Sequence, residues 1–299
     1  MDAFYCHHFA LPLPVGHSFP MAKYRLLHER VASHADAWNI QLLEPPAASD
    51  EDLLRVHCPG YVARMVSGEV GSDEMRRIGF PWSGQMIERS RRSSGATIMA
   101  LRSALAGNRI AANLAGGTHH ASFDRGGGYC VFNDSVIAAR HAQHHRLARR
   151  LLIVDLDVHQ GNGTAELCAG DESIYTFSMH GAHNYPARKP ASDLDVALPS
   201  GTGDAQYLDS LTRHLSVALR DSNADAVIYL AGADPYVGDR LGRLALTKAG
   251  LAERDRQVFQ ACRRHSLPVA VTMAGGYAAE VGDIVDIHAE TIRQAAKHL

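Results

Sequence analysis

The segment Leu151-Leu152-Ile153-Val154-Asp155-Leu156-Asp157-Val158-His159-Gln160-Gly161-Asn162-Gly163 joins a short apolar run to a polar, glycine-rich stretch. The apolar run is typical of a strand buried in a parallel sheet. Asp155, Asp157 and His159 alternate along the chain, which in an extended segment places their side chains on one side. Carboxylates are costly to bury without a cation or a proton. The segment therefore predicts a metal site at the end of a buried strand; the alternative is an ordinary turn that starts at Asp155.

Several other apolar runs are separated by longer amphipathic segments, a pattern that predicts a mostly parallel α/β sheet. We expect strands at residues 109–115, 151–157, 173–177, 226–231 and 268–273. Ser83 and Asn133 are suitable N-caps for two of the intervening helices. The helices are expected at residues 83–106, from 133–134 to about 150, and at 20–37, 207–220, 248–265 and 284–299, whereas 67–81 and 180–203 are irregular.

The composition limits the function classes. The chain has 299 residues, of which 46% are hydrophobic and 21% charged, and a formal net charge of −2. These values are typical of a globular protein, and the lack of a long basic run argues against nucleic-acid or anionic-membrane binding. Arg89, Arg91 and Arg92 are interpreted as the solvated face of a helix. Nothing resembles a signal peptide or a membrane span.

The cysteines point to reduced thiols. There are five, at positions 6, 58, 130, 168 and 262, and none forms a Cys-x-x-Cys pair. An odd number without such pairs favours a cytoplasmic protein with free thiols. A metal in this chain would then be held by oxygen and nitrogen atoms, as in sites that keep an open position for chemistry.

Polar residues follow four of the predicted strands. The strand expected at 109–115 is followed by Gly116-Gly117-Thr118-His119-His120, and the one at 151–157 ends in the segment from Asp155 to His159. The strand expected at 226–231 is followed by Asp234, and the one at 268–273 by Gly275-Gly276-Tyr277. Open α/β sheets bind ligands beyond the carboxyl ends of their strands, so these segments are expected to form one site. Each segment also has an ordinary interpretation. Tandem histidines occur at His7-His8 and His144-His145 too, where we interpret them as structural or exposed. Asp234 would suit a helix cap or a turn, and Tyr277 would suit a position in the hydrophobic core.

Two other site types are poorly supported. The glycine-rich pieces at residues 126–128, 161–163 and 201–203 lack the full Gly-x-Gly-x-x-Gly spacing, and no Gly-Lys-Ser/Thr follows them. A nucleotide site is therefore not expected. No Gly-x-Ser-x-Gly element suggests a serine hydrolase.

The motifs resemble those of the zinc-dependent histone deacetylase superfamily. The segments Gly-Gly-Thr-His-His, Asp-Leu-Asp-Val-His-Gln-Gly-Asn-Gly, Ala-Gly-Ala-Asp-Pro and Ala-Gly-Gly-Tyr occur in that family's order, at residues 116–120, 155–163, 231–235 and 274–277. The segments 160–163 and 124–129 look most like class IV deacetylases and their bacterial counterparts. The resemblance implies a single domain over residues 1–299 with the three-layer α/β/α arginase-deacetylase fold and a mostly parallel sheet of about eight strands.

Transferred position by position, the resemblance implies that Asp157, His159 and Asp234 are the zinc ligands. Iron(II) or cobalt(II) also suits these ligands. A catalytic zinc site of this type polarises a carbonyl group and acidifies water. The resemblance also implies a potassium ion, bound largely through backbone carbonyls, at Asp155, Asp157, His159, Ser178 and Met179.

The same resemblance implies catalytic roles for His119, His120, Asp155, Asn162 and Tyr277. His120 is the expected general base and acid, and His119, paired with Asp155, gives electrostatic help. Tyr277 is expected to donate a hydrogen bond to the oxyanion. Asn162 occupies the position of an aspartate in class I enzymes, so it is expected to orient His120 while raising its pKa less.

A substrate tunnel with aromatic walls is also implied. Gly128 and Tyr129 are expected to form one wall, and Gly275 and Gly276 to allow the backbone to aim Tyr277 at the substrate. The second wall is expected from the 180–190 loop, with His183 or Tyr185 as candidates.

We therefore predict a zinc-dependent amidohydrolase that removes an acetyl or longer acyl group from an acylated lysine or a related alkyl amine. An acetylpolyamine or small-metabolite amidohydrolase of the same fold is one alternative, and a two-metal ureohydrolase is another. A non-catalytic acyl-amine-binding protein is an alternative of a different class. The sequence does not decide the acyl chain length, the native metal or the oligomeric state.

Overall fold

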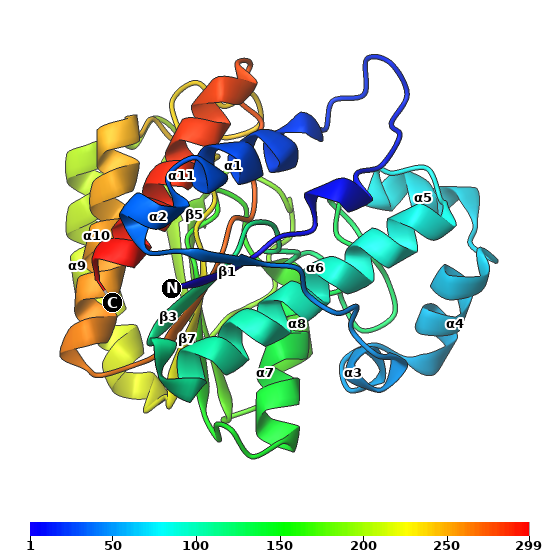
Figure 1. Ribbon diagram of the computed structural model, residues 1–299, viewed down its shortest axis with the longest axis horizontal. Coiled ribbons are helices and arrows are strands. Elements are labelled where there is room, and N and C mark those ends of the chain that lie inside the picture. Colours follow the sequence, from blue (N-terminus) through cyan, green and yellow to red (C-terminus); the bar gives the residue numbers. More distant parts are fainter. Residues whose placement is uncertain (299) are drawn as a thin grey trace.

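An all-parallel sheet of eight strands lies at the centre of the computed structural model, which describes residues 1–298 (Figure 1). The strands lie in the order β2-β1-β3-β8-β7-β4-β5-β6. Their bounds are β1 Asp2–Phe4, β2 Gln41–Leu43, β3 Ile110–Asn113, β4 Leu151–Asp155, β5 Ile174–Gly181, β6 Leu194–Leu198, β7 Ala226–Leu230 and β8 Val269–Thr272. The predicted fold class, a three-layer α/β/α arrangement around a parallel sheet, is confirmed.

Helices cover both faces of the sheet (Figure 1). One face carries α6 (Gly84–Ser103), α7 (Asp134–His144) and α8 (Asn162–Cys168), and the other carries α1 (Ala22–Ala32), α9 (Asp204–Ser222), α10 (Lys248–Arg264) and α11 (Val281–Lys297). Shorter elements are α2 (Ala35–Trp38), α3 (Asp50–Leu54), α4 (Pro59–Ser67), α5 (Ser72–Ile78), the 3-10 turn η1 (His7–Phe9) and the π-helical turn η2 (Ala104–Asn108). None of the helices in residues 1–298 combines the length with the apolar composition that a bilayer crossing requires.

The alternation of side chains in β4 shows how the sheet separates two hydrophobic cores. Leu152 and Val154 pack against α1 and α9 to α11, whereas Leu151 and Ile153 pack against α6 and α7. Both faces of a central parallel strand are thus covered, which explains its continuous apolar sequence. The strand ends at Asp155, two residues earlier than predicted, and Asp157 and His159 lie in the turn that follows.

Helix starts agree better with the sequence than helix ends and edge strands do. The Ser83 side chain accepts a hydrogen bond from the Met86 amide, and the Asn133 side chain accepts one from the Val136 amide, so both predicted N-caps are present. The helix expected at residues 20–37 is divided into α1 and α2, and α7 ends at His144 rather than near 150. The stretches expected to be irregular contain α5 and β6, and the very short β1 and β2 were not predicted.

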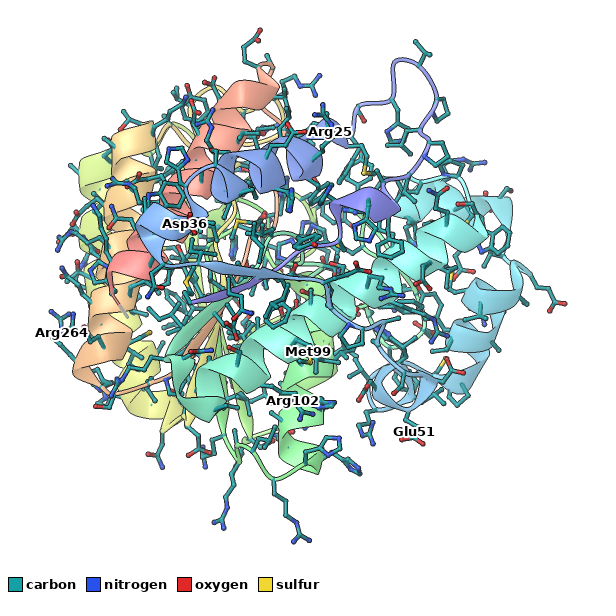
Figure 2. The ribbon with its side chains drawn as sticks, viewed as in Figure 1. Arg25, Asp36, Glu51, Met99, Arg102 and Arg264 are labelled. Atoms are coloured by element: carbon teal, nitrogen blue, oxygen red, sulfur yellow. The ribbon has the colours of Figure 1, made fainter. Side chains whose placement is uncertain are left out.

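The arginine cluster on α6 departs from its predicted exposure. Arg91 and Arg92 are half-buried and pair with carboxylates of Asp50 and Glu88, but Arg89 is only 8% exposed. Its guanidinium packs over the ring of Tyr24 from α1. The interpretation of Arg89 as solvated was wrong, because the N-terminal segment and α1 cover this side of α6. Charges of both signs elsewhere project into solvent, among them Arg25, Asp36, Glu51 and Arg264 (Figure 2).

Candidate metal centre and active site

The four polar segments that follow β3, β4, β7 and β8 meet at one edge of the sheet. These strands are neighbours, in the order β3-β8-β7-β4, and all are parallel. Their carboxyl ends therefore lie side by side. His119 and His120 follow β3, Asp157 and His159 follow β4, and Asp234 and Tyr277 follow β7 and β8. All six side chains are buried in this region.

Asp157, His159 and Asp234 form a compact group of metal-ligating side chains. One ligand atom from each lies within 4.8 Å of the others. His159 Nδ1 is 3.0 Å from Asp157 Oδ1 and 3.3 Å from Asp234 Oδ2. Asp234 Oδ2 is buried and has no hydrogen-bond partner in residues 1–298. A buried carboxylate oxygen without a partner fits a bound cation.

The electrostatics of this group also favour a cation. Burial and the neighbouring Asp157 raise the pKa of Asp234 to about 7. Burial alone would lower the pKa of His159, but its hydrogen bond to Asp157 and the nearby Asp234 carboxylate outweigh that effect and raise the pKa to about 10. Without a metal, a proton on His159 is shared by two crowded carboxylates. A divalent ion bound to this oxygen- and nitrogen-donor set would displace that proton.

Glycine at position 275 allows the β8 segment to approach the two carboxylates. A Cβ atom there would lie 1.9 Å from Asp234 Oδ2 and 2.6 Å from Asp157 Oδ2. The Gly275 amide donates a hydrogen bond of 2.7 Å to Asp157 Oδ2. Gly276, with φ of 145°, then turns the chain toward Tyr277. The two glycines thus shape the metal-ligand group as well as the backbone before Tyr277.

His119 and His120 differ in protonation because their partners differ. His119 Nδ1 donates a 2.6 Å hydrogen bond to Asp155 Oδ2. Burial opposes a charge on His119, but Asp155 and Asp157 outweigh it and raise its pKa to about 9. Burial and the charges of His119 and His159 hold the pKa of His120 well below its usual range. At neutral pH, His119 is therefore cationic and His120 neutral.

The hydrogen bonds of His120 define its tautomer. Asn162 Oδ1 lies 2.7 Å from His120 Nδ1. If the amide oxygen accepts, the proton is on Nδ1 and the lone pair is on Nε2. That Nε2 lies 3.1 Å from Nε2 of His119, which donates to it. A water molecule that approaches His120 has to replace His119 as the partner of this lone pair.

Asp134 holds the segment that carries both histidines and was not recognised from the sequence as a site residue. Its carboxylate accepts hydrogen bonds from the amides of Gly117 and Thr118, at 3.0 and 2.7 Å, and from the hydroxyl groups of Thr118 and Thr97, both at 2.6 Å. Asn133-Asp134 was noticed only as a helix start. A carboxylate in the first turn of a helix carries no local signal of these long-range contacts.

Tyr277 faces the metal-ligand group from the wall of a pocket. Burial, followed by the charges of Asp234 and Asp157, raises the pKa of Tyr277 well above its usual value, so its hydroxyl group remains a donor. Asp157, His159 and both tandem histidines line the same pocket. We call this space the catalytic pocket. The phenol thus lines the same pocket as Asp157 and His159.

Aromatic side chains contribute to the wall of the catalytic pocket, and the substrate tunnel stays a prediction. The ring of Tyr129 lies 5.8 Å from that of Tyr277. Gly128 approaches His120 closely, since a Cβ atom at position 128 would be 2.5 Å from His120 Cδ2. Of the two candidates for the other wall, Tyr185 lies 4.8 Å from the ring of His120 and is 47% exposed. Both candidates are exposed, and the ring contact with His120 favours Tyr185 over His183.

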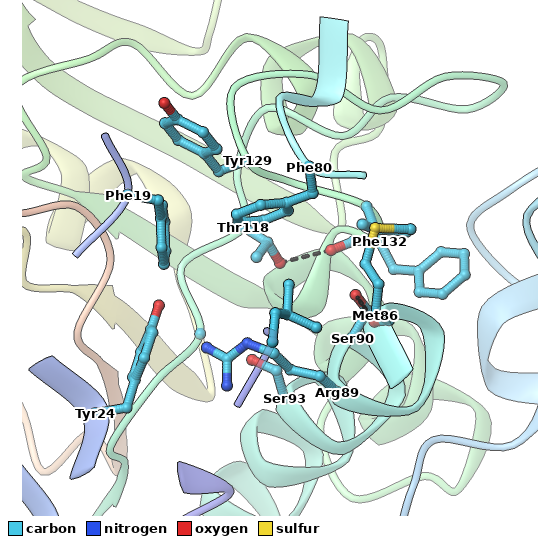
Figure 3. A pocket seen from close by; sticks show the side chains of 13 residues that line it. Phe19, Tyr24, Phe80, Met86, Arg89, Ser90, Ser93, Thr118, Tyr129 and Phe132 are labelled. Carbon is cyan, nitrogen blue, oxygen red and sulfur yellow. Dashed lines mark hydrogen bonds between the residues drawn. The ribbon is translucent and has the colours of Figure 1, made fainter. Parts of the chain in front are cut away.

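Several pocket residues had no recognisable sequence signal. Phe19, Lys23 and Tyr24 come from the start of the chain, and Arg89 comes from α6. Figure 3 shows Phe19, Tyr24 and Arg89 around a cavity beside Thr118 and Tyr129. They lie outside every recognised motif, and the sequence around them does not distinguish them from other helix or loop residues.

The potassium site stays a prediction. Asp155 in β4 is in register with Ser178 in β5, and Met179 follows in the same strand. This arrangement brings several of the expected backbone carbonyls onto adjacent strands.

The comparisons with known proteins agree with this geometry. The model of the histone deacetylase domain matches residues 17–292. The chain belongs to the histone deacetylase family. It is 32% identical over 272 residues to histone deacetylase 2 of Arabidopsis thaliana, a match that covers 87% of this chain and 70% of the plant protein. The family resemblance expected from the motifs is thus confirmed.

Two bacterial proteins are also similar. An uncharacterised protein of Picosynechococcus is 43% identical over 287 residues, covering 96% of this chain and 95% of the relative. A histone deacetylase-like amidohydrolase of Pseudomonas aeruginosa is 29% identical over 288 residues, covering 89% and 74%. The crystal structure of the HDA15 HD domain has the same fold, with a TM-score of 0.83 at 22% identity over 99% of this chain and 90% of that chain.

Proposed function

We propose that this member of the histone deacetylase family is a metal-dependent deacylase that hydrolyses an acylated lysine or a related acylated amine. One observation carries the proposal: Asp157 and His159 of the buried Asp157-His159-Asp234 group line the same pocket as the neutral His120 and the protonated Tyr277. Family membership supports the deacylase reaction, and the donor set supports zinc, with iron(II) or cobalt(II) as substitutes.

The side chains have complementary tasks in this reaction. A divalent ion held by Asp157, His159 and Asp234 would supply Lewis acidity at the amide carbonyl and lower the pKa of water. His120 Nε2 takes a proton from the attacking water and later gives it to the leaving amine. Tyr277 donates a hydrogen bond to the developing oxyanion. His119, kept cationic by Asp155, adds positive charge beside the reacting carbonyl.

A two-metal ureohydrolase would need a second set of ligands. In residues 1–298, only the Asp157-His159-Asp234 group brings metal-ligating atoms together. We therefore expect one divalent ion per chain in elemental analysis, and two equivalents would favour the ureohydrolase.

The test is a panel of acyl-lysine peptides and acylated polyamines of increasing acyl length, assayed with metal-loaded wild type and with Tyr277→Phe. We expect hydrolysis by wild type and a kcat about 10²- to 10³-fold lower in the variant, because the oxyanion loses one donor. Tyr175→Phe, at the opposite end of β5, is the matched control. A metal-loaded wild type that is inert toward the whole panel would instead favour an acyl-amine-binding protein.

Replacing Asn162 with aspartate is expected to shift the pH dependence of kcat/KM. A carboxylate at the 2.7 Å contact would favour the charged form of His120 and raise its pKa. Because the base must be neutral, activity would be lost at a higher pH on the acidic side, and the acidic limb would move upward. An unchanged limb in the pH-rate profile of Asn162→Asp would contradict the assigned role of His120 or its coupling to position 162.

A further inference from the structure

Arg89 is a buried cation that has no carboxylate partner in residues 1–298. Its Nη1 atom is fully covered and forms no hydrogen bond, and the side chain forms no ion pair among residues 1–298. Its guanidinium carbon lies 4.1 Å from the centroid of the Tyr24 ring. The nearby thiol of Cys6 offers no negative charge, because burial raises its pKa despite the opposing effect of Arg89. Burying an arginine without a counter-charge is costly, so the unsatisfied donor capacity of Nη1 favours an anionic ligand.

The guanidinium points into a cavity that adjoins the catalytic pocket (Figure 3). This rear pocket has a volume of about 40 Å³ and is lined by Leu11, Phe80, Met86, Arg89, Val131 and Phe132 together with residues of the shared wall. The wall shared with the catalytic pocket consists of Phe19, Tyr24, Gly116, Thr118 and Tyr129. Ser90, Ser93 and Thr118 add hydroxyl groups beside Arg89, and the other side chains of the rear pocket are aliphatic or aromatic, so a small ligand with an anionic end fits its chemistry.

Lys23 places a second buried cation on the catalytic side of Tyr24. It is 2% exposed, and its ammonium group is 5.3 Å from the Tyr277 ring centroid and 5.4 Å from that of Tyr24. Among residues 1–298, the Gly276 carbonyl is the one hydrogen-bond acceptor that its ammonium group contacts, at 3.3 Å. No carboxylate in residues 1–298 pairs with it. Each of the two adjoining pockets is therefore lined by one buried cation, Lys23 in the catalytic pocket and Arg89 in the rear pocket.

We propose that the rear pocket binds a carboxylate at the far end of the acyl group, so that the preferred substrates carry short acyl chains such as succinyl or glutaryl. This inference rests on the proposed deacylase function. The scissile carbonyl lies beside Tyr277, and the acyl chain extends from there toward Lys23 and Arg89. The small volume suits a few atoms rather than a long alkyl chain. Hydrolysis adds water across the amide bond and yields the protonated amine and the free dicarboxylate.

The first experiment compares charged and neutral acyl groups of equal length on one lysine peptide. Glutaryl is compared with pentanoyl, and succinyl with butyryl. Wild type is expected to favour the carboxyacyl peptide by about tenfold or more in kcat/KM, because charge-assisted hydrogen bonds stabilise its terminal anion. Arg89→Gln is expected to lower this ratio about 10- to 100-fold, and Arg89→Lys to retain part of it. Arg102→Gln, at the far end of α6, is the matched control (Figure 2).

A second measurement does not depend on catalysis. Glutarate alone is expected to raise the Tm of the metal-loaded wild type but not that of Arg89→Gln, whose own Tm without glutarate reports its folding. Equal stabilisation by acetate would show that the cations bind any small carboxylate, and would overturn the proposal.

The outcomes separate this inference from the proposed function. Hydrolysis of acetyl and butyryl peptides without a preference for carboxyacyl groups would refute the inference alone. If Arg89→Gln kept the wild-type ratio of kcat/KM between carboxyacyl and neutral acyl peptides, the inference would also be refuted. Inertness toward every acyl peptide would refute both.

Discussion

Asp234→Asn is expected to abolish metal binding and to lower kcat by about 10³-fold or more. The variant removes the charge of one of the three proposed ligands, and a catalytic metal contributes several kcal/mol to the transition state, at 1.36 kcal/mol for each factor of ten. Elemental analysis and steady-state kinetics would measure the two effects together. Wild type treated with a chelator is expected to behave like the variant and to recover when zinc is added back.

The same substitution is expected to stabilise the metal-free protein. Asp234 Oδ2 is buried without a partner, and burial and Asp157 already raise its pKa to about 7. Above that pH, ionised Asp234 destabilises the metal-free fold, and a neutral amide removes this charge while it can donate to Asp157. At pH 8 we expect Asp234→Asn to have a higher Tm than wild type from which a chelator has removed the metal. Metal-loaded wild type is measured separately, because the bound ion itself raises the Tm.

Asp171→Asn is the matched control for this substitution, because Asp171 pairs with Arg140 at the other end of the sheet. It should keep the metal content and kcat of wild type. An Asp234→Asn protein with one equivalent of metal and normal kcat would refute the assignment of Asp234 as a ligand.

His120→Ala is expected to lower kcat by about 10²- to 10⁴-fold with a much smaller change in KM. General acid-base catalysis by a positioned histidine has this magnitude. His120 suits the role because burial and two cationic neighbours hold its pKa low and because Asn162 fixes its Nδ1 proton. The pH profile of the variant should also lose the acidic limb that reports protonation of the base.

His144→Ala is the control for His120→Ala, because this histidine belongs to an exposed tandem pair on α7. It should leave kcat unchanged. Metal content must be equal in the compared proteins, since His120 lies near His159. A kcat within about threefold of wild type in metal-loaded His120→Ala would remove His120 from the mechanism and leave His119 as the remaining candidate.

Much of the architecture could be predicted because its signals are local. The apolar run before Asp155 marks a buried strand, and Ser83 and Asn133 cap their helices as their residue types suggest. The edge strands β2 and β6 were missed, since runs of three to five residues are too short to stand out from loops in the sequence. Helix ends were less certain, because α7 stops at His144 without a proline or glycine to mark it.

The sequence by itself determined which residues meet at the metal-ligand group. His119, Asp157, Asp234 and Tyr277 each follow a strand, and parallel neighbouring strands bring their carboxyl ends to one edge of the sheet. The tertiary structure alone decided what surrounds them. Arg89, on a helix, and Lys23, near the chain start, lie at the pocket only because α1 and α6 pack beside the same edge, and such packing leaves no trace in local sequence.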